Sequence, residues 1–595
     1  MLFSKRWLAL TLALWGGQMV SLGYCNPETT RIRYNVQWEG VPSRSLRSAL
    51  ERQAQTVLNR KRPPASVRQL NHRAQGDIPR LETVLHSQGY YDGRVTVTAR
   101  TESSPARVVF IVVTGPLYTI GQWVVAYTDI NDVNSPPPVL TAGIVQDRPA
   151  VAAEILRTEQ DFLKQLQNQG FPFARLAPRD VAIDTEQHTV NLTSHIEPGP
   201  RATFGPLTIE GLTQVEAVYV QRRVRWTAGD SYQAKHLRDL EKDLLASGLF
   251  AAARVAPGAA LDPNGALPIK VTLSERKHRT LRVGGNYVSD EQGLGGRVSW
   301  EHRNLAGRGQ RLRVEAGSSQ TEWWQANSYI QPDLGHRNLD LHLDLELGHQ
   351  HPQAYASESI RAGTSLHYHF TRQSQIWGGL ALENSQVDQL GMRSRHRFFE
   401  VPLGLDLDRR DDPLNAIKGW RFMVQTTPYV DARSDLSFFK NYAEGRFYRE
   451  ILPALNTVFA ARVGTGVITG ASLLDVPADK RFYAGGAGSV RGYAYQSIGP
   501  EVNGTPLGGL TLVETSLELR TQLDNKFGTV LFLDGGLVMT DQFRRGSEEP
   551  MRWGAGVGLR YNLGFAPLRF DIAFPLNGDN NDREYQFYVS LGQAF

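Results

Sequence analysis

The stretch Arg481–Ile498, RFYAGGAGSVRGYAYQSI, is the most informative part of this sequence. It lies inside about forty residues, roughly 469–508, that lack a clear strand pattern, although strand-like segments flank them on both sides. A loop of this length within a compact β domain is usually functional or disordered. Arg491 stands between Val490 and Gly492-Tyr493, among glycines that allow close backbone packing. We therefore expect this loop to have a function.

The C-terminal half alternates with a period of two residues, which predicts β-strands. The clearest example runs from Leu339 to Leu347, where every second residue is leucine and most of the residues between are ionisable. A leucine row facing lipid and an acidic row facing a wet lumen would satisfy both sets of side chains. Residues 276–595 are therefore predicted to form an all-β membrane barrel, with sixteen antiparallel strands to within about two.

The N-terminal third contains a threefold repeat. Each copy has a helical stretch that ends at a glycine, followed by a strand: Ile78–Gly89, Ile155–Gly170 and Leu237–Gly248. The terminal glycines lie 81 and 78 residues apart (170 − 89 and 248 − 170), which sets the size of the repeat. The pattern predicts three β-α-α-β-β modules of an α+β kind, at 26–115, 116–200 and 201–275.

Residues 1–25 have the pattern of a removable secretory signal. Lys5 and Arg6 form a basic start, and Trp7–Trp15 is an apolar stretch. Cleavage is expected after Gly23 or after Cys25, the only cysteine of the chain. After cleavage at the second position no cysteine remains, which argues against disulfides and thiolate metal sites.

The composition and motifs argue against several classes of function. The net charge of +5 is modest and no basic block is present, so nucleic-acid binding has little support. No GxSxG, HExxH or phosphate-binding loop is present, and we expect neither an enzyme nor a cofactor site. The pairs His349/His351 and His367/His369 could hold a metal, although such pairs more often only line a lumen or loop.

The motifs resemble those of a known family. The segment 481–498 closely resembles the signature loop of the outer-membrane protein-assembly and two-partner-secretion transporter superfamily, whose VRGY or VRGF tip folds back into the barrel. Three further segments resemble elements of this superfamily: Asn304–Gly309 (NLAGRG), Asp411–Gly419 (DDPLNAIKG) and Phe532–Gly535 (FLDG). The three repeats resemble polypeptide-transport-associated (POTRA) domains.

The resemblance implies roles for particular residues. Arg491 is expected to pair with Asp534 inside the lumen, with Glu518 as a possible second acceptor. In the superfamily the first and last strands meet at a weak seam, and glycines on these strands fit that feature because glycine weakens strand pairing. The residues concerned are Val490, Arg491, Gly492 and Tyr493 in the loop, Gly284, Gly285 and Gly592 at the seam, and Phe595 as a C-terminal insertion signal.

The combination of three repeats with this loop is most similar to the translocation and assembly module branch of the superfamily. That resemblance implies capture of unfolded outer-membrane protein clients, such as autotransporters, on the repeats and insertion at the seam. It also implies an inner-membrane-anchored, periplasm-spanning partner and contact with outer-membrane lipid. The alternative is a two-partner-secretion exporter for a large exoprotein, and a third class is a receptor or plain porin.

Overall fold

The computed structural model describes residues 31–102, 104–128, 146–288, 293–542, 549–564, 567–579 and 582–591. The predicted signal segment 1–25, Gly592 and Phe595 lie outside the described residues. The chain divides into two compact units, one of residues 1–203 with 231–234 and the other of residues 204–230 with 235–595. No described helix has the length and apolar character needed to cross a membrane.

The first repeat folds into a three-stranded sheet with helices, in the strand order β1-β3-β2. It contains three helices rather than the two expected, because the chain bends at Ala54 between α1 and α2. The buried carboxylate of Asp77 stabilises this bend by accepting hydrogen bonds from the backbone N–H groups of Gln55 and Thr56, at 2.9 and 2.8 Å. The elements are β1 (Tyr34–Glu39), α1 (Arg44–Gln53), α2 (Gln55–Leu58), α3 (Val67–Ser87), β2 (Arg94–Arg100) and β3 (Ala106–Val113).

The second and third repeats share this sheet arrangement, with the opening strand next to the closing strand, but the described part of the second repeat has one helix, α4, where two were expected. In the second, β4 pairs with β7 in parallel, and the short strands β5 and β6 pair with the other edge of β7. In the third, the order is β8-β10-β9. The elements are β4 (Thr119–Tyr127), α4 (Ala152–Gln167), β5 (Arg175–Leu176), β6 (Asp180–Asp184), β7 (Thr189–Glu197), β8 (Thr203–Glu210), α5 (Ala217–Gln221), α6 (Ala234–Ala246), β9 (Phe250–Pro257) and β10 (Ala266–Glu275).

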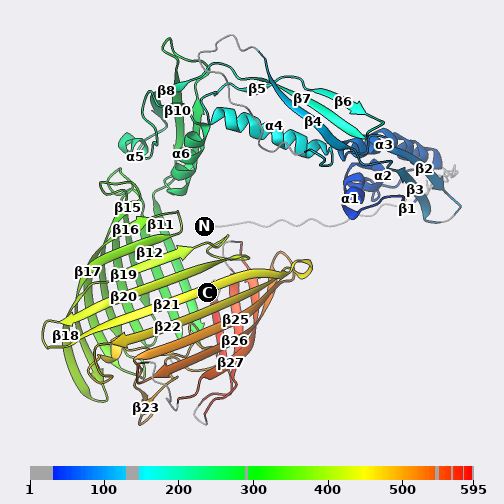
Figure 1. The fold of residues 1–595 in the computed structure, drawn as a ribbon. Helices are drawn as coiled ribbons and strands as arrows, with labels where there is room; N and C mark the ends of the chain where they lie inside the picture. The colour runs from blue at the N-terminus through cyan, green and yellow to red at the C-terminus, as the bar shows by residue number, and fades with distance from the viewer. Residues whose placement is uncertain are drawn as a thin grey trace, which may run out of the picture. The chain divides into compact units, whose positions relative to one another are not determined.

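The rest of the chain forms a closed antiparallel barrel (Figure 1). Both β18 and β19 pair with β17 and β20, so they are two halves of one strand and the barrel has sixteen strands. The interruption falls at Val401-Pro402, where proline lacks an N–H for the ladder. The strands are β11 (Arg279–Val288), β12 (Leu294–His302), β13 (Arg311–Ser318), β14 (Glu322–Gln331), β15 (Leu339–Gln350), β16 (Ala356–His369), β17 (Gln375–Gln389), β18 (Met392–Glu400), β19 (Leu403–Asp408), β20 (Gly419–Asp431), β21 (Ser437–Leu452), β22 (Thr457–Thr469), β25 (Thr511–Gln522), β26 (Phe527–Met539), β27 (Arg552–Asn562), β28 (Pro567–Pro575) and β29 (Gln586–Leu591).

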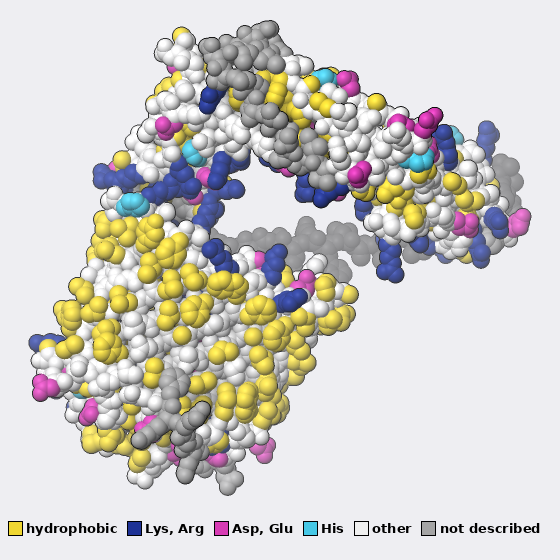
Figure 2. Space-filling model, viewed as in Figure 1, with side chains coloured by type: hydrophobic (Ala, Val, Ile, Leu, Met, Phe, Trp, Pro, Cys, Tyr) yellow, Lys and Arg dark blue, Asp and Glu magenta, His cyan; other side chains and the backbone are white. Residues whose placement is uncertain are grey.

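The two faces of the barrel wall differ in chemistry as the alternation predicts. On β25, Glu514 and Glu518 are buried, whereas Leu517 and Leu519 are 37% and 40% exposed. Figure 2 shows hydrophobic side chains gathered over the outside of the barrel strands. Such an apolar outer surface with a polar interior fits a barrel surrounded by lipid.

The long loop between β22 and β25 folds into the barrel instead of away from it. It contains a 3₁₀ turn (Ala478–Lys480) and the two-residue strands β23 (Glu501–Val502) and β24 (Thr505–Pro506). Its apolar side chains are buried together with residues of the barrel wall. This loop cluster comprises Phe482, Ala484, Val490, Tyr493 and Ile498, packed with Leu512 of β25 and Val538 of β26.

Candidate functional site

The centre of the site is the side chain of Arg491, which is 2% exposed inside the barrel. Its guanidinium grips the Asp534 carboxylate with two hydrogen bonds, from Nε to Oδ2 at 2.6 Å and from Nη2 to Oδ1 at 2.9 Å. The backbone N–H of Arg491 donates to the same carboxylate at 3.2 Å. A two-pronged pair of this kind fixes orientation as well as charge, which a lysine would do poorly.

Two further carboxylates complete the surroundings of Arg491. Its Nη1 lies 2.8 Å from Oε1 of Glu518 and 3.3 Å from Oδ2 of Asp571. The guanidinium carbon lies 3.5 Å from the ring centre of Phe532, which adds a cation–π contact. One arginine from the loop therefore joins three strands of the wall: β25, β26 and β28.

Two wall glycines allow the loop to approach this closely. A Cβ at Gly554 would lie 1.9 Å from the carbonyl oxygen of Arg491, and one at Gly536 would lie 2.5 Å from Cγ2 of Val490. Contacts below 3.0 Å require something to move, so these two positions need glycine. The seat of the loop is thus encoded in the wall strands as well as in the loop.

The residues after Arg491 attach the loop to the last part of the barrel. The N–H of Gly492, whose φ is +102°, donates to the hydroxyl of Tyr588 on β29 at 3.1 Å. The hydroxyl of Tyr493 lies 3.1 Å from both the carbonyl of Trp553 and Oδ1 of Asn577. The structure thus gives all four residues Val490–Tyr493 specific contacts with the wall.

The first and last strands meet over a short length. Among the described residues, β11 and β29 share two register pairs, Tyr287 with Val589 and Val288 with Tyr588. By comparison, β11 and β12 share nine pairs, and β28 and β29 share six. Each added ladder pair strengthens strand association, so this seam is the weakest junction of the described barrel.

Two predicted seam glycines lie beyond the register pairs that are described between β11 and β29. Gly284 and Gly285 pair with Arg297 and Gly296 of β12, and they line a cavity of about 390 Å³ beside Ser590 of β29. A Cβ at either glycine would meet its nearest atom at 3.5 Å, which is ordinary contact. Crowding therefore does not require glycine at these two positions. The two glycines leave this part of β11 without side chains.

The Asn304–Gly309 turn attaches the barrel to the third repeat within the second unit. Asn304 donates from Nδ2 to the carbonyl of Gln214 at 2.9 Å, and its Oδ1 accepts from the N–H of Gly309 at 2.9 Å. Arg308 pairs with Glu216 at 2.7 Å. The motif therefore sets how the third repeat sits on this end of the barrel.

The structure brings together most of the residues singled out from the sequence, and it adds one. Arg491 lies against Asp534 and Glu518 as the resemblance implies, whereas the importance of Asp571 was missed. The alternation of Phe570 and Ile572 around Asp571 was the available signal, because it places the acid on the inner face. The histidine pairs lie in β15 to β16, and no described group of three ligating side chains could hold a metal.

Comparisons with known proteins agree with this architecture. Outer membrane protein assembly factor BamA of Nitratidesulfovibrio vulgaris is 21% identical over 481 residues, which cover 76% of this chain and 58% of that protein. The human sorting and assembly machinery component 50 homolog is 26% identical over 407 residues, covering 60% of this chain and 83% of that protein. This chain thus spans little more than half the length of the bacterial relative.

A solved structure and a family model extend the comparison. The crystal structure of Haemophilus ducreyi BamA lacking POTRA domains 1–3 superposes with a TM-score of 0.64 at 18% identity, covering 80% of this chain and 100% of that one. Residues 304–595 match the family model described as the Omp85 superfamily domain. The matched region takes in every barrel strand from β13 onward.

Proposed function

We propose that this protein inserts or translocates other proteins at the bacterial outer membrane. The observation that carries the proposal is the short junction of β11 and β29, with two register pairs among the described residues. A barrel that opens there exposes two strand edges, and an unpaired edge accepts a strand from another chain. The assembly role named for the BamA relatives supports the same function.

The finer proposal is that the protein acts as TamA, the outer-membrane subunit of a translocation and assembly module. Three repeats, assigned as POTRA-like domains at 26–115, 116–200 and 201–275, fit that subunit better than the five of BamA. A TamB-like protein anchored in the inner membrane would then bind the repeats. Autotransporters would be among the clients, and strand addition to the repeat sheets would supply their capture.

A reversible cross-link at the seam tests the first proposal. Cysteines at 287 and 589, a register pair of β11 and β29, would lock the seam when oxidised. The matched control places cysteines at 298 and 316, a register pair of β12 and β13. We expect the oxidised seam variant, reconstituted in proteoliposomes, to lose client insertion and to recover it on reduction.

The control separates seam opening from general damage. The oxidised 298/316 variant should insert client at the rate of the unmodified protein. Equal insertion by the locked and reduced seam variants would contradict the proposal. Export of a soluble exoprotein without membrane insertion would instead support a two-partner-secretion exporter.

A further inference from the structure

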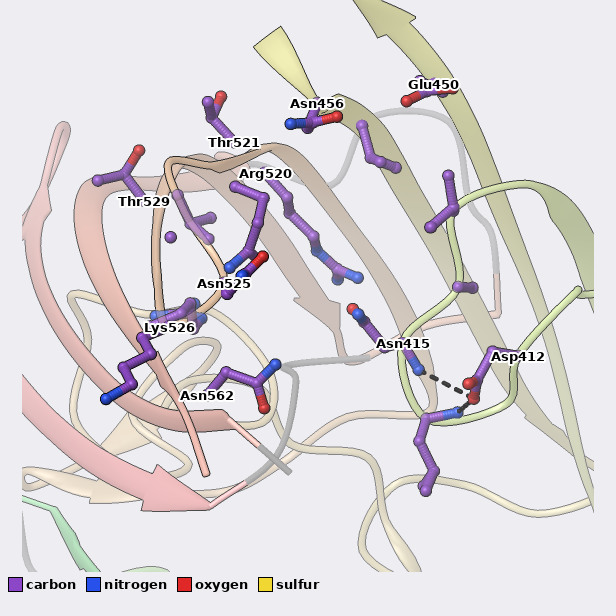
Figure 3. Close-up of a pocket in the computed structure, with 18 of the residues that line it drawn as sticks. Asp412, Asn415, Glu450, Asn456, Arg520, Thr521, Asn525, Lys526, Thr529 and Asn562 are labelled. Atoms are coloured by element: carbon purple, nitrogen blue, oxygen red, sulfur yellow. Dashed lines mark hydrogen bonds between the residues drawn. The ribbon is translucent and has the colours of Figure 1, made fainter. Parts of the chain in front are cut away.

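A cavity of about 850 Å³ lies inside the barrel, at the end where the chain enters from β10. Its wall is formed by the turn before β20 and by the adjoining ends of β21, β22 and β25–β27. Figure 3 shows Arg520, Asn525, Lys526 and Asn562 on one side of it, and Asp412 with Asn415 on the other. The opposite end of the barrel is where the loop with Arg491 is attached.

Two of the three carboxylates in this wall are engaged by the backbone of their own turns, and the third is Glu450. Asp412 accepts hydrogen bonds from the N–H groups of Leu414 and Asn415, at 2.7 and 3.3 Å. Asp524 accepts from the N–H groups of Lys526 and Phe527, both at 2.7 Å. These acids stabilise turns and form no described ion pair with the arginines that line the cavity.

Positive charge is in excess where the cavity meets the Arg491 cluster. Four buried arginines share three buried carboxylates, and each of the seven side chains belongs to a residue no more than 8% exposed. An uncompensated charge in such surroundings is costly. The residues are Arg491, Arg520, Arg560 and Arg569, with Glu518, Asp534 and Asp571.

The excess is located at Arg560 and Arg569. These two residues are register partners on β27 and β28, and among the described residues both pair only with Asp571, which also contacts Arg491. Like charges directly opposite each other on neighbouring strands repel. A second anion between them would relieve that repulsion.

The geometry of Arg560 indicates where the anion would bind. In Arg410, Arg421 and Arg491 the edge formed by Nε and Nη2 grips a carboxylate. In Arg560, Nε and Nη2 are both buried and have no hydrogen-bond partner among the described residues, and the same is true of Nη2 of Arg569. Three donor nitrogens from two strands thus remain to be satisfied.

We propose that this cavity binds a phosphate group at Arg560, which lines it, with Arg569, the register partner of Arg560 on β28, as the second donor. A phosphate offers more acceptor oxygens than a carboxylate and matches the planar fork of arginine. The volume exceeds that of a bare phosphate, and Leu414, Val458 and Val530 give the wall an apolar part. These features favour the phosphate of a phospholipid headgroup. The evidence for this site does not depend on the proposal that the protein inserts or translocates other proteins.

Titration calorimetry on the full-length protein in neutral-detergent micelles tests the proposal. The probes are inorganic phosphate, dihexanoyl-phosphatidylglycerol and acetate, each at constant ionic strength. We expect saturable binding of the first two, and tighter binding of the lipid if the headgroup is the ligand. Equal affinities for the two phosphates would assign the site to a small anion, while acetate binding of equal strength would overturn the assignment to phosphate.

Arg560→Gln should weaken phosphate binding about tenfold or more, because charged hydrogen bonds are lost. The matched control is Arg421→Gln, an inner-face arginine outside the cavity whose fork is already filled by Asp406. It should bind phosphate like the unmodified protein. Unchanged binding by Arg560→Gln would refute the site.

A second variant keeps the test valid if Arg560→Gln does not fold. Val530 is 1% exposed and is the register partner of Gly558, whose added Cβ would lie 2.6 Å from Nη1 of Arg560. Val530→Glu would therefore supply a resident carboxylate. We expect it to abolish phosphate binding and to raise the melting temperature of the ligand-free barrel. A lower melting temperature or retained binding would count against the proposal.

Discussion

Removing the side chain of Arg491 should release the loop from the barrel before it prevents barrel assembly. After Arg491→Ala, Glu518 would keep its ion pair with Arg520, and Asp571 would keep Arg560 and Arg569. The remaining carboxylate, Asp534, would keep only the hydroxyl of Ser516 among its described side-chain partners. The loss is therefore concentrated on one buried carboxylate.

The size of the effect follows from that orphaned charge. Removing one partner of a buried ion pair costs about 3–5 kcal/mol. At about 1.4 kcal/mol per factor of ten, the docked loop would be disfavoured by roughly two to three and a half orders of magnitude. The double variant Arg491→Ala/Asp534→Ala should recover part of this loss, because it leaves no unpaired acid.

Limited trypsin digestion of the folded protein measures the loop directly. The bonds after Lys480 and Arg481 lie in the loop and remain in every variant. When the loop closes faster than trypsin cuts it, the cleavage rate is proportional to the fraction of molecules in which the loop is open. Arg491→Ala should therefore be cut much faster, the double variant at an intermediate rate, and Arg421→Ala at the rate of the unmodified protein.

Two outcomes would refute this reasoning. The first is a fully assembled Arg491→Ala barrel, judged by its migration in unheated gels, with unchanged cleavage and unchanged client insertion. The second is a double variant cut as fast as the single one, since the orphaned Asp534 would then not be the cause.

Two further predictions concern the wall glycine under the loop and a buried carboxylate of the third repeat. Gly554→Ala should speed cleavage of the loop, because the new Cβ would clash with the Arg491 carbonyl, whereas Gly488→Ala has open space and should behave like the unmodified protein. Burial alone would raise the pKa of Glu275, but hydrogen bonds from the backbone N–H groups at 213–215 hold it at about 2. Because this pKa is depressed in the folded state, the carboxylate stabilises the third repeat above about pH 4.5 and loses that effect as the pH falls towards 2. Glu275→Gln should remove this part of the pH dependence in denaturant unfolding, and equal slopes for both proteins between pH 2 and 4.5 would contradict it.

The barrel could be predicted from the sequence because its two faces require different side chains. Leucine and glutamate alternate on β25, and this alternation alone predicts that Glu518 faces the inside of the barrel. Asp534 was harder, because β26 is apolar on both of its faces. Its position followed from the family resemblance alone.

Other features depend on contacts that no local pattern encodes. The break between α1 and α2 requires Asp77, more than twenty residues away, to accept hydrogen bonds from the new helix. The interrupted strand at Pro402 still closes the barrel because its neighbours pair with both halves. The charge imbalance around Arg560 emerges only when β27 and β28 are brought side by side.

The hydrogen bond from Gly492 to Tyr588 gives the loop a hold on the last strand of the barrel. The same strand, β29, also forms the short seam with β11. The loop contact and the seam contact therefore both restrain β29. A ligand or antibody that pulls the loop outward must break this bond and would leave β29 less restrained. Binding to the loop would then change how easily the seam between β11 and β29 opens, although the ligand itself does not touch the seam.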